Sequence, residues 1–379
     1  MALGVAVLVF CAVPLPARHA RTVVAKAIHG EGALRAGAAQ VRIVLGEHPV
    51  LAGYAGRHRA ARVATEVFAR ALVLEAGAAR ATLATIDTLL IPPGLSLPEC
   101  GLLAATHTHT GPGGLWDSYA AGFLGTGPYD ARQRQAVQAA LDEAVRQAAQ
   151  ALQPAQVIAA RTDWAGGPSR PRSEGPLDRG FFALRVQGAA GPIATVVDYA
   201  MHPTSAPRDQ LSSDWPGVVA AQFQEPVFVL AGALGNASFD RALHTEELGL
   251  RVAHEAKLLL ASAKPSEGAL DCSEQAMTLP HPFGSPRVPS LLRRAAGNLL
   301  GFLFAPAAVE TRLSFGGVTL WGIPGEPVGE LGLRARPAVV VSLANGYAGY
   351  VETEARWQKG QGEAARTDFG PDLSRALGL

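Results

Sequence analysis

The sequence predicts a single mixed α/β domain with long loops. Short apolar runs typical of buried strands recur along the chain, together with two stretches of helical periodicity. Glycine and proline are abundant, at 42 and 27 of 379 residues, which indicates many turns. Strand signals continue on both sides of the glycine- and proline-rich stretches. These stretches are therefore expected to be loops and not domain boundaries.

The first half of the chain is expected to form mainly strands. Apolar runs predict strands at residues 41–45, 81–90 and 101–105. A helical stretch is expected near residues 61–72, after the glycine-punctuated segment LAGYAG at residues 51–56.

Two longer helices and several strands follow. The clearest helix is residues 130–152, where Val137, Leu141, Val145, Ala148 and Leu152 recur at helical spacing. A second helix is expected at residues 246–263, before the Lys264–Pro265 stop. Further strands are expected at residues 157–160, 194–199, 227–230, 317–323 and 339–343.

The N-terminal segment is strongly apolar. Residues 1–14 are shorter than the roughly 20 residues that span a bilayer, and they match the apolar region of a secretory signal. We therefore expect residues 1–20 to be a signal peptide or N-terminal hydrophobic segment, with a buried strand as the alternative. An exported protein, periplasmic or secreted, is expected, with residues 25–379 as its folded domain.

The cysteines and the charge exclude several function classes. Cys11, Cys100 and Cys272 show neither CxxC nor CxH spacing, so no thiolate zinc site is encoded. Export permits a Cys100–Cys272 disulfide, and buried free thiols are the alternative. With 33 Lys+Arg against 32 Asp+Glu, the chain has no basic excess, which argues against a nucleic-acid partner.

The strongest functional signal is the segment THTHTGPGG at residues 106–114. It follows the predicted strand 101–105, and His107 and His109 are two residues apart. In a strand they would project from the same face. Two imidazoles beside a glycine loop suit a metal or proton-transfer site, and two structural histidines in a loop are the alternative.

Other candidate ligands follow later predicted strands. They are His202 after residues 194–199, Glu326 after residues 317–323, and Tyr347 and Tyr350 after residues 339–343. Because a zinc site usually gathers three or four N or O ligands, these side chains could complete a metal centre. Each is also compatible with a purely structural role.

Together these segments resemble the neutral/alkaline non-lysosomal ceramidase family. The motifs that carry the resemblance, in the family's order, are GYA (residues 53–55), THTHTGPGG (106–114), YAMHPTS (199–205), SDWPG (213–217), IPGE (323–326) and LANGYAGYVET (343–353). The resemblance implies a ceramidase-like catalytic domain over residues 25–379. No counterpart of the family's immunoglobulin-like C-terminal domain is expected, because the chain ends soon after Tyr350.

The resemblance implies a zinc-dependent amidase with one zinc ion per chain. The family's ligands match His107, His202, Glu326 and Tyr350. Imidazole, carboxylate and phenolate suit zinc, which lowers the pKa of bound water to about 7. The implied reaction is hydrolysis of N-acyl sphingosine (ceramide), or a related N-acyl lipid, to fatty acid and amine by zinc-activated water. The implied partner is a lipid amide at a membrane surface, and nothing in the sequence indicates a protein partner.

Three further residues acquire implied roles from the resemblance. His109 is expected to bind the carbonyl or oxyanion, or to move a proton to the leaving amine. Ser238 matches a family serine considered for nucleophile or pocket roles, and a pocket role is favoured because activated water needs no second nucleophile. Arg170 matches an arginine that faces the substrate, with Arg172 as the alternative register.

Departures from the family pattern leave alternatives open. Gly362 stands where the family has a tyrosine twelve residues beyond the zinc tyrosine, and the segment GNASFD at residues 235–240 lacks the family's acidic residue. A catalytically degenerate homologue that binds lipid or metal is therefore an alternative. A TIM-barrel amidohydrolase is another, because an HxH can begin its metal site, but no repeated βα rhythm follows His109.

Overall fold

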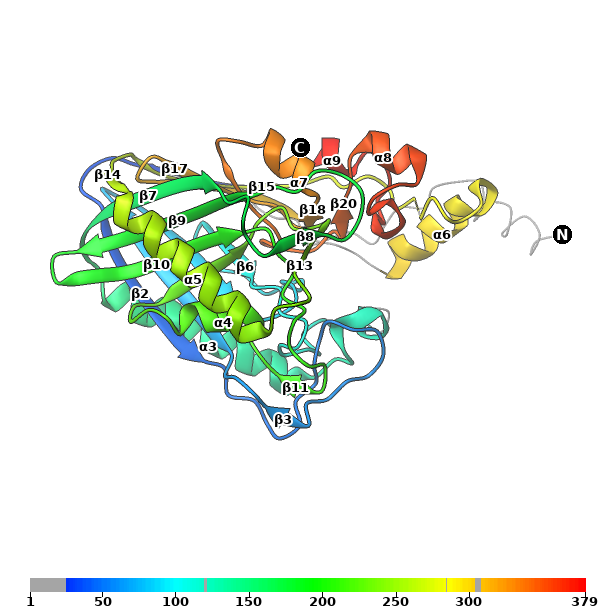
Figure 1. Cartoon of the computed structure of the whole chain (residues 1–379), viewed down its shortest axis with the longest axis horizontal. Coiled ribbons are helices and arrows are strands. Elements are labelled where there is room, and N and C mark those ends of the chain that lie inside the picture. Colours follow the sequence, from blue (N-terminus) through cyan, green and yellow to red (C-terminus); the bar gives the residue numbers. More distant parts are fainter. Residues whose placement is uncertain (1–24, 119–120, 284, 304–307) are drawn as a thin grey trace.

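The computed structural model describes residues 25–118, 121–283, 285–303 and 308–379 (Figure 1). The expected leader, residues 1–20, lies outside the described residues. Two β-sheets pack against each other, and helices cover the outer face of the larger sheet. This arrangement confirms the predicted mixed α/β class. No helix within the described ranges combines the length and hydropathy that a bilayer crossing requires.

The larger sheet has the strand order β12-β10-β9-β7-β2-β4-β5-β6, with β14 beside β7. Most neighbours are antiparallel, but β5 with β6 and β10 with β12 are parallel. The strands are β2 (Arg35–Arg42), β4 (Phe68–Ala76), β5 (Ala79–Ile86), β6 (Gly101–Ala105), β7 (Gln153–Asp163), β9 (Gly180–Gly188), β10 (Gly191–Tyr199), β12 (Val227–Ala231) and β14 (Lys264–Ser266).

The smaller sheet has the order β1-β15-β16-β17-β19. Its strands are β1 (Lys26–Gly30), β15 (Leu270–Ala276), β16 (Val309–Phe315), β17 (Val318–Gly322) and β19 (Val339–Val341). Short two-stranded pairs join β3 (Arg62–Val63) to β11 (Gln210–Leu211), β8 (Ser169–Pro171) to β13 (Ala237–Phe239), and β18 (Glu326–Pro327) to β20 (Tyr350–Val351). The last two pairs lie at the functional site described below.

The main core lies between the two sheets. Fully buried leucines of the larger sheet, such as Leu83 and Leu102, belong to one cluster with Leu313 and Leu320 of the smaller sheet. A disulfide between Cys100, just before β6, and Cys272 in β15 joins the two sheets covalently. The bond that the sequence left open is therefore present.

Helices occupy the opposite face of the larger sheet. Helix α3 packs on β2 and β4, and α5 lies across the strands near β9, as Figure 1 shows. The helices are α3 (Ala131–Gln150), α4 (Asp214–Ala220), α5 (Thr245–Ser262), α6 (Ser290–Leu303), α7 (Gly329–Arg334), α8 (Glu354–Lys359) and α9 (Leu373–Ala376), with a π-helical turn η1 (Gly122–Thr126) and a 3₁₀ turn η2 (Ala364–Arg366).

Most predicted elements are confirmed, but the early segment is not. The helix expected near residues 61–72 is wrong, because most of it lies in β3 and β4. Its Ala, Leu and Arg residues favour a helix locally, yet β4 pairs along its length with β2 and β5 and is almost entirely buried. Tertiary pairing outweighs the weak local preference. The strand expected at residues 41–45 begins earlier and ends at Arg42.

Candidate metal centre

Three histidines converge where β6, β10 and the loop after β17 meet. One ring nitrogen from each of His107, His109 and His202 lies within 4.8 Å of the others. The Nε2 atoms of His107 and His109 are 3.3 Å apart. His107 and His202 are only 2% and 1% exposed. A buried cluster of this kind could hold a metal ion.

His107 and His109 do not share a strand face, which corrects the simple geometric expectation. Strand β6 ends at Ala105, and His107 has a left-handed backbone with φ 65°. Such a conformation is costly for a non-glycine residue and is typical of functional sites. Main-chain carbonyls then fix both rings, because Nδ1 of His107 lies 2.8 Å from Leu89 O and Nδ1 of His109 lies 2.9 Å from Gly53 O.

Gly53 allows this contact because a side chain there would collide with the histidine loop. An added Cβ would lie 2.2 Å from the carbonyl oxygen of His109, and Gly53 has φ 119°. Only glycine combines this backbone with so close an approach. The GYA motif at residues 53–55 therefore packs directly against the loop that carries His107 and His109.

His202 joins the cluster from the end of β10. Its Nδ1 lies 2.7 Å from Ala237 O in β13, and the amide of His109 donates to Pro203 O at 3.2 Å. The two histidine loops are therefore hydrogen-bonded to each other. This contact explains how residues far apart in the sequence present their rings to one point.

The hydrogen bonds fix the protonation of the three rings. A carbonyl oxygen can only accept, so Nδ1 of each ring carries a proton, and in the neutral form of the ring Nε2 presents a lone pair to the centre of the cluster. Burial lowers the pKa of His202 and lowers that of His109 well below its usual value, which favours the neutral form of both rings. Converging lone pairs in a buried site favour a cation at their centre.

Glu326 supplies negative charge to the same point. Its Oε2 lies 3.2 Å from Nε2 of His202 and 3.4 Å from Nε2 of His107. Burial raises the pKa of Glu326, but without a metal the positive charge and donated hydrogen bonds available from the His107 and His202 rings hold it well below its usual value. Its second oxygen, Oε1, accepts a hydrogen bond of 3.0 Å from the Tyr347 hydroxyl. The carboxylate is thus oriented as a metal-binding carboxylate usually is.

The loop that carries the tyrosines is held against the edge strand β6. The Asn345 side chain accepts from Leu103 N at 2.8 Å and donates to Gly101 O at 2.8 Å. These bonds satisfy the exposed edge of β6 and place the loop beside the histidines that follow this strand. Asn345 of the LANGYAGY motif therefore anchors the tyrosine loop to β6.

Tyr350 completes the ring of polar groups. Its hydroxyl lies 3.1 Å from Nε2 of His202, and β18 pairs Glu326 directly with Tyr350. Burial, followed by the charge of Glu326, raises the pKa of Tyr350 well above its usual value, so the phenol holds its proton. Loss of this proton requires a strong positive charge nearby, which a metal ion provides.

Arg172, and not Arg170, contacts this group of side chains. Nη1 of Arg172 donates to the Tyr350 hydroxyl at 3.2 Å and lies 3.1 Å from Nε2 of His202. The buried Glu363 holds its Nε at 3.3 Å. Arg170, predicted as the substrate-facing arginine, is half-exposed and pairs with Asp240 at 2.8 Å. The structure therefore places the alternative register at the cluster.

Ser238 lies nearby in β13, directly after Ala237, whose carbonyl holds His202. It pairs across the two strands with Arg170 of β8. Among the described residues its hydroxyl has no hydrogen-bond partner, so no base is positioned to activate it. This geometry favours a pocket role over a nucleophilic one.

At Gly362 a larger residue would collide with the side chain of Glu352. An added Cβ would lie 2.1 Å from Oε2 of Glu352, and the backbone has φ 60°. Glu352 is buried and accepts from the amide of Glu363 at 2.8 Å. A residue with a hydroxyl donor at this position would have to displace the Glu352 carboxylate and adopt a strained backbone, and Glu363 beside it holds Arg172.

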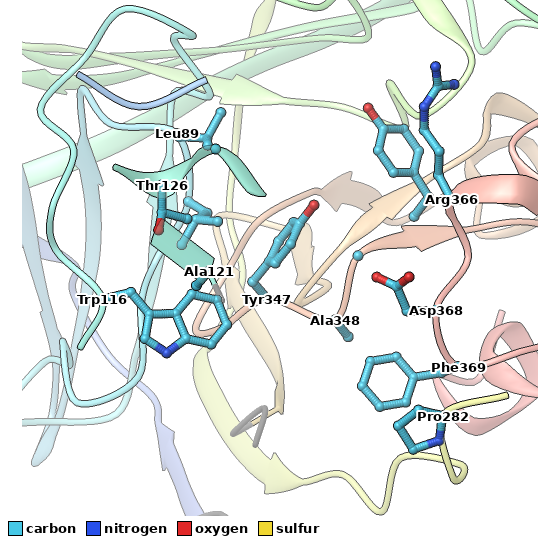
Figure 2. A pocket seen from close by; sticks show the side chains of 14 residues that line it. Leu89, Trp116, Ala121, Thr126, Pro282, Tyr347, Ala348, Arg366, Asp368 and Phe369 are labelled. Carbon is cyan, nitrogen blue, oxygen red and sulfur yellow. The ribbon is translucent and has the colours of Figure 1, made fainter. Parts of the chain in front are cut away.

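A pocket adjoins the cluster on the side of the tyrosines (Figure 2). Its volume is about 330 Å³. Tyr347 and Tyr350 form the wall shared with the cluster, and the remaining lining is mainly apolar, with Leu89, Trp116 and Phe369. The polar groups gathered at one end and the apolar walls beyond them suit an amphipathic ligand.

Comparison with known proteins identifies the fold. No family model matches the chain, and no curated protein matches it significantly in sequence. The neutral ceramidase from Pseudomonas aeruginosa superposes with a TM-score of 0.78 over 92% of this chain and 73% of its own, at 20% sequence identity. The chain has the neutral ceramidase fold. A ceramidase complexed with C2 matches similarly, with a TM-score of 0.76 at 18% identity, over 92% of this chain and 74% of its own.

The fold result confirms the resemblance seen in the sequence motifs. Sequences only 20% identical share the neutral ceramidase fold because the strand framework tolerates substitution, while function depends on the site itself. The structure brings His107, His109, His202, Glu326 and Tyr350 together. Ser238 lies at the edge of this group and Arg170 points away to Asp240. The sequence offered Arg172 only as the alternative to Arg170. It gave no specific role to Tyr347, although this residue lies within the LANGYAGYVET motif.

Proposed function

We propose that the protein is a zinc-dependent, ceramidase-like amide hydrolase. The observation that carries this proposal is the buried cluster of three histidine rings, two of which place Nε2 within 3.4 Å of Glu326, with every Nδ1 held by a main-chain carbonyl. N and O donors alone, without thiolate, suit zinc at a catalytic site. His107, His202, Glu326 and Tyr350 would hold one zinc ion per chain. Zinc, when bound, polarises a carbonyl and lowers the pKa of water.

The chain's own residues then have distinct tasks. The Nδ1–H of His109 donates to the Gly53 carbonyl. The Nε2 atom of the same ring can therefore accept a proton and pass it to the leaving nitrogen. Arg172 faces Tyr350 with a guanidinium nitrogen, which can donate to an oxygen that becomes negative in the transition state. Glu363 keeps this guanidinium in place.

The proposed substrate is N-acyl sphingosine or a related N-acyl lipid, which is cleaved to a fatty acid and an amine. The apolar pocket beside the tyrosines supports a lipid amide over a polar one. The two superposed proteins are named as ceramidases, which supports the same class. A membrane surface is the proposed source of such a substrate.

Export is part of the proposal. The Cys100–Cys272 disulfide supports an oxidising compartment, periplasmic or extracellular, and agrees with an apolar N-terminal segment at residues 1–20. Fractionation of cells that produce the full chain would test it. Recovery of the protein in the cytoplasm with both thiols reduced would contradict it.

The test of function combines metal content with turnover. Purified full-length protein is assayed for zinc and for release of fatty acid from a fluorescent N-acyl sphingosine, before chelation, after chelation and after zinc is restored. We expect one zinc per chain and activity that is lost and regained with it. Stoichiometric zinc without cleavage of any N-acyl amine would favour a catalytically degenerate homologue. This is the second candidate function, because Gly362 lacks the side chain found in the family pattern. Absence of zinc binding would overturn the proposal.

A further inference from the structure

One charged group in the pocket has no partner. Asp368 lines the pocket on the wall opposite Leu89 and Trp116, and Figure 2 shows it beside Phe369 and Ala348. Among the described residues no side chain or amide donates to this carboxylate, and no cation pairs with it. Arg366, which also lines the pocket, is paired with Glu363 instead.

The location of this carboxylate favours a ligand that donates a hydrogen bond. Burial raises the pKa of Asp368 to about 6, with no compensating interaction. At neutral pH the group is mostly ionised and only partly exposed, and no described residue donates to it, so a ligand that enters the pocket can supply the donor. The nearby Tyr347 cannot meet it, because its hydroxyl donates to Glu326.

We propose that Asp368 determines substrate specificity by accepting a hydrogen bond from a hydroxyl group on the amine half of the substrate. The pocket would then hold an N-acyl amino alcohol with its apolar arm against Trp116 and Phe369. The inference rests on the proposed amide hydrolysis, because Tyr347 and Tyr350 connect this pocket to the metal cluster. It adds which half of the amide enters the pocket and which functional group is recognised there.

A hydroxyl fits this position better than an aliphatic chain alone. A hydrogen bond to a charged acceptor is stronger than one between neutral groups, and a substrate that lacks the donor leaves the carboxylate desolvated and unpaired. A site built in this way discriminates against the analogue that lacks the hydroxyl. The expected preference is about 10- to 100-fold in kcat/KM for the hydroxylated substrate.

The experiment compares matched substrates on the zinc-loaded full chain. An N-octanoyl sphingosine and its 1-deoxy and 3-deoxy analogues are assayed with wild-type protein, Asp368→Asn, Asp368→Ala and the control Asp372→Asn. Asp372 lies in the same C-terminal segment but is exposed and paired with Arg375. We expect Asp368→Ala to abolish the preference for at least one hydroxyl, mainly by lowering kcat/KM for the hydroxylated substrate, and Asp372→Asn to leave it unchanged. An unchanged ratio in Asp368→Ala would overturn the inference.

Binding measurements separate this inference from the proposed function. Calorimetric titration with sphingosine and with its deoxy amines requires no turnover. If no amide is cleaved but Asp368→Ala removes the preference for the hydroxylated amine, the hydrolase proposal fails and the pocket inference stands. If Asp368→Ala weakens all amines equally, the carboxylate recognises ammonium and the hydroxyl inference is wrong. Thermal melts confirm folding, and the isosteric Asp368→Asn variant replaces Asp368→Ala if the latter unfolds.

Discussion

In the histidine cluster every Nδ1 faces a main-chain carbonyl, whereas in the adjoining pocket the Asp368 carboxylate accepts from no described residue. Both regions are largely buried and share the wall formed by Tyr347 and Tyr350. They differ in what completes them. The cluster presents lone pairs that a cation can satisfy, and the pocket presents a charge that a donor on a ligand can satisfy.

This difference teaches how the two regions are organised. Carbonyl partners make the cluster rigid before any metal arrives, so its geometry depends on the fold and not on the ligand. The pocket instead retains a largely desolvated carboxylate that no described residue pairs with, and such groups are frequent where function outweighs stability. Substitutions should therefore affect metal and turnover in one region, and specificity and stability in the other.

The largest effect is expected in the cluster. Replacement of His107 or His202 by alanine removes a proposed nitrogen ligand from the buried cluster. We expect zinc to be lost and turnover of N-acyl sphingosine to fall at least about 1,000-fold. Metal analysis and initial rates measure both quantities, and His254→Ala on the exposed face of α5 is the control. Retention of full zinc content by both variants would show that the histidine cluster does not bind the zinc ion.

Arg172 and Arg170 offer a direct contrast. Arg172→Ala is expected to lower kcat about 100-fold with zinc retained, because it removes a donor beside Tyr350. Arg170→Ala should change kcat by less than about threefold, since its partner is Asp240 near the surface. Parallel kinetics and metal analysis decide between them, and a larger loss in Arg170→Ala would restore the original sequence prediction.

Tyr347→Phe tests whether the cluster depends on its supporting bonds. The variant removes the hydroxyl that donates to Glu326 without changing the ring. We expect zinc affinity to fall about tenfold, as for loss of other groups that orient metal ligands. Competition with a fluorescent chelator measures this affinity. An unchanged affinity would mean that the carboxylate is held by the histidines alone.

Asp368→Asn should increase stability in a pH-dependent way. Because burial raises the pKa of Asp368 to about 6, from its usual 3.8, the folded state binds the proton more tightly than the unfolded state does. The wild-type free energy of unfolding therefore decreases as pH rises from about 4 to 6, and the loss persists at higher pH. At pH 8 we expect Asp368→Asn to be more stable by about 2 kcal/mol, and at pH 3 the two proteins should be equal. Denaturant unfolding at both pH values tests this. Equal free energies of unfolding at pH 8 would show that the ionised carboxylate does not destabilise the folded state.

The smallest effect is expected at Ser238. Since no base contacts its hydroxyl among the described residues, Ser238→Ala should change kcat by less than about threefold. A change confined to KM would agree with a pocket role. A loss comparable to that of His107→Ala would instead identify Ser238 as a nucleophile, and steady-state kinetics distinguish the two results.

Much of the framework could be predicted from local patterns. The helix at residues 130–152 and the strand at residues 101–105 were recovered because periodicity and apolar runs report burial directly. Motifs at the ends of predicted strands likewise indicated His107, His202 and Glu326. The segment at residues 61–72 failed because helix-forming residues there are paired on both sides within the sheet.

The sequence by itself determined the fold class and the set of side chains that could bind a metal, because strand burial and residue chemistry are local properties. Only the tertiary structure decided how these side chains meet. The left-handed backbone of His107 replaces the expected strand geometry, and β8 ends at Pro171, so that Arg172 beyond it reaches Tyr350 while Arg170 within it pairs with Asp240. The partnerless carboxylate of Asp368 was also invisible in the sequence, since burial and missing donors are properties of the surrounding packing and not of the residue.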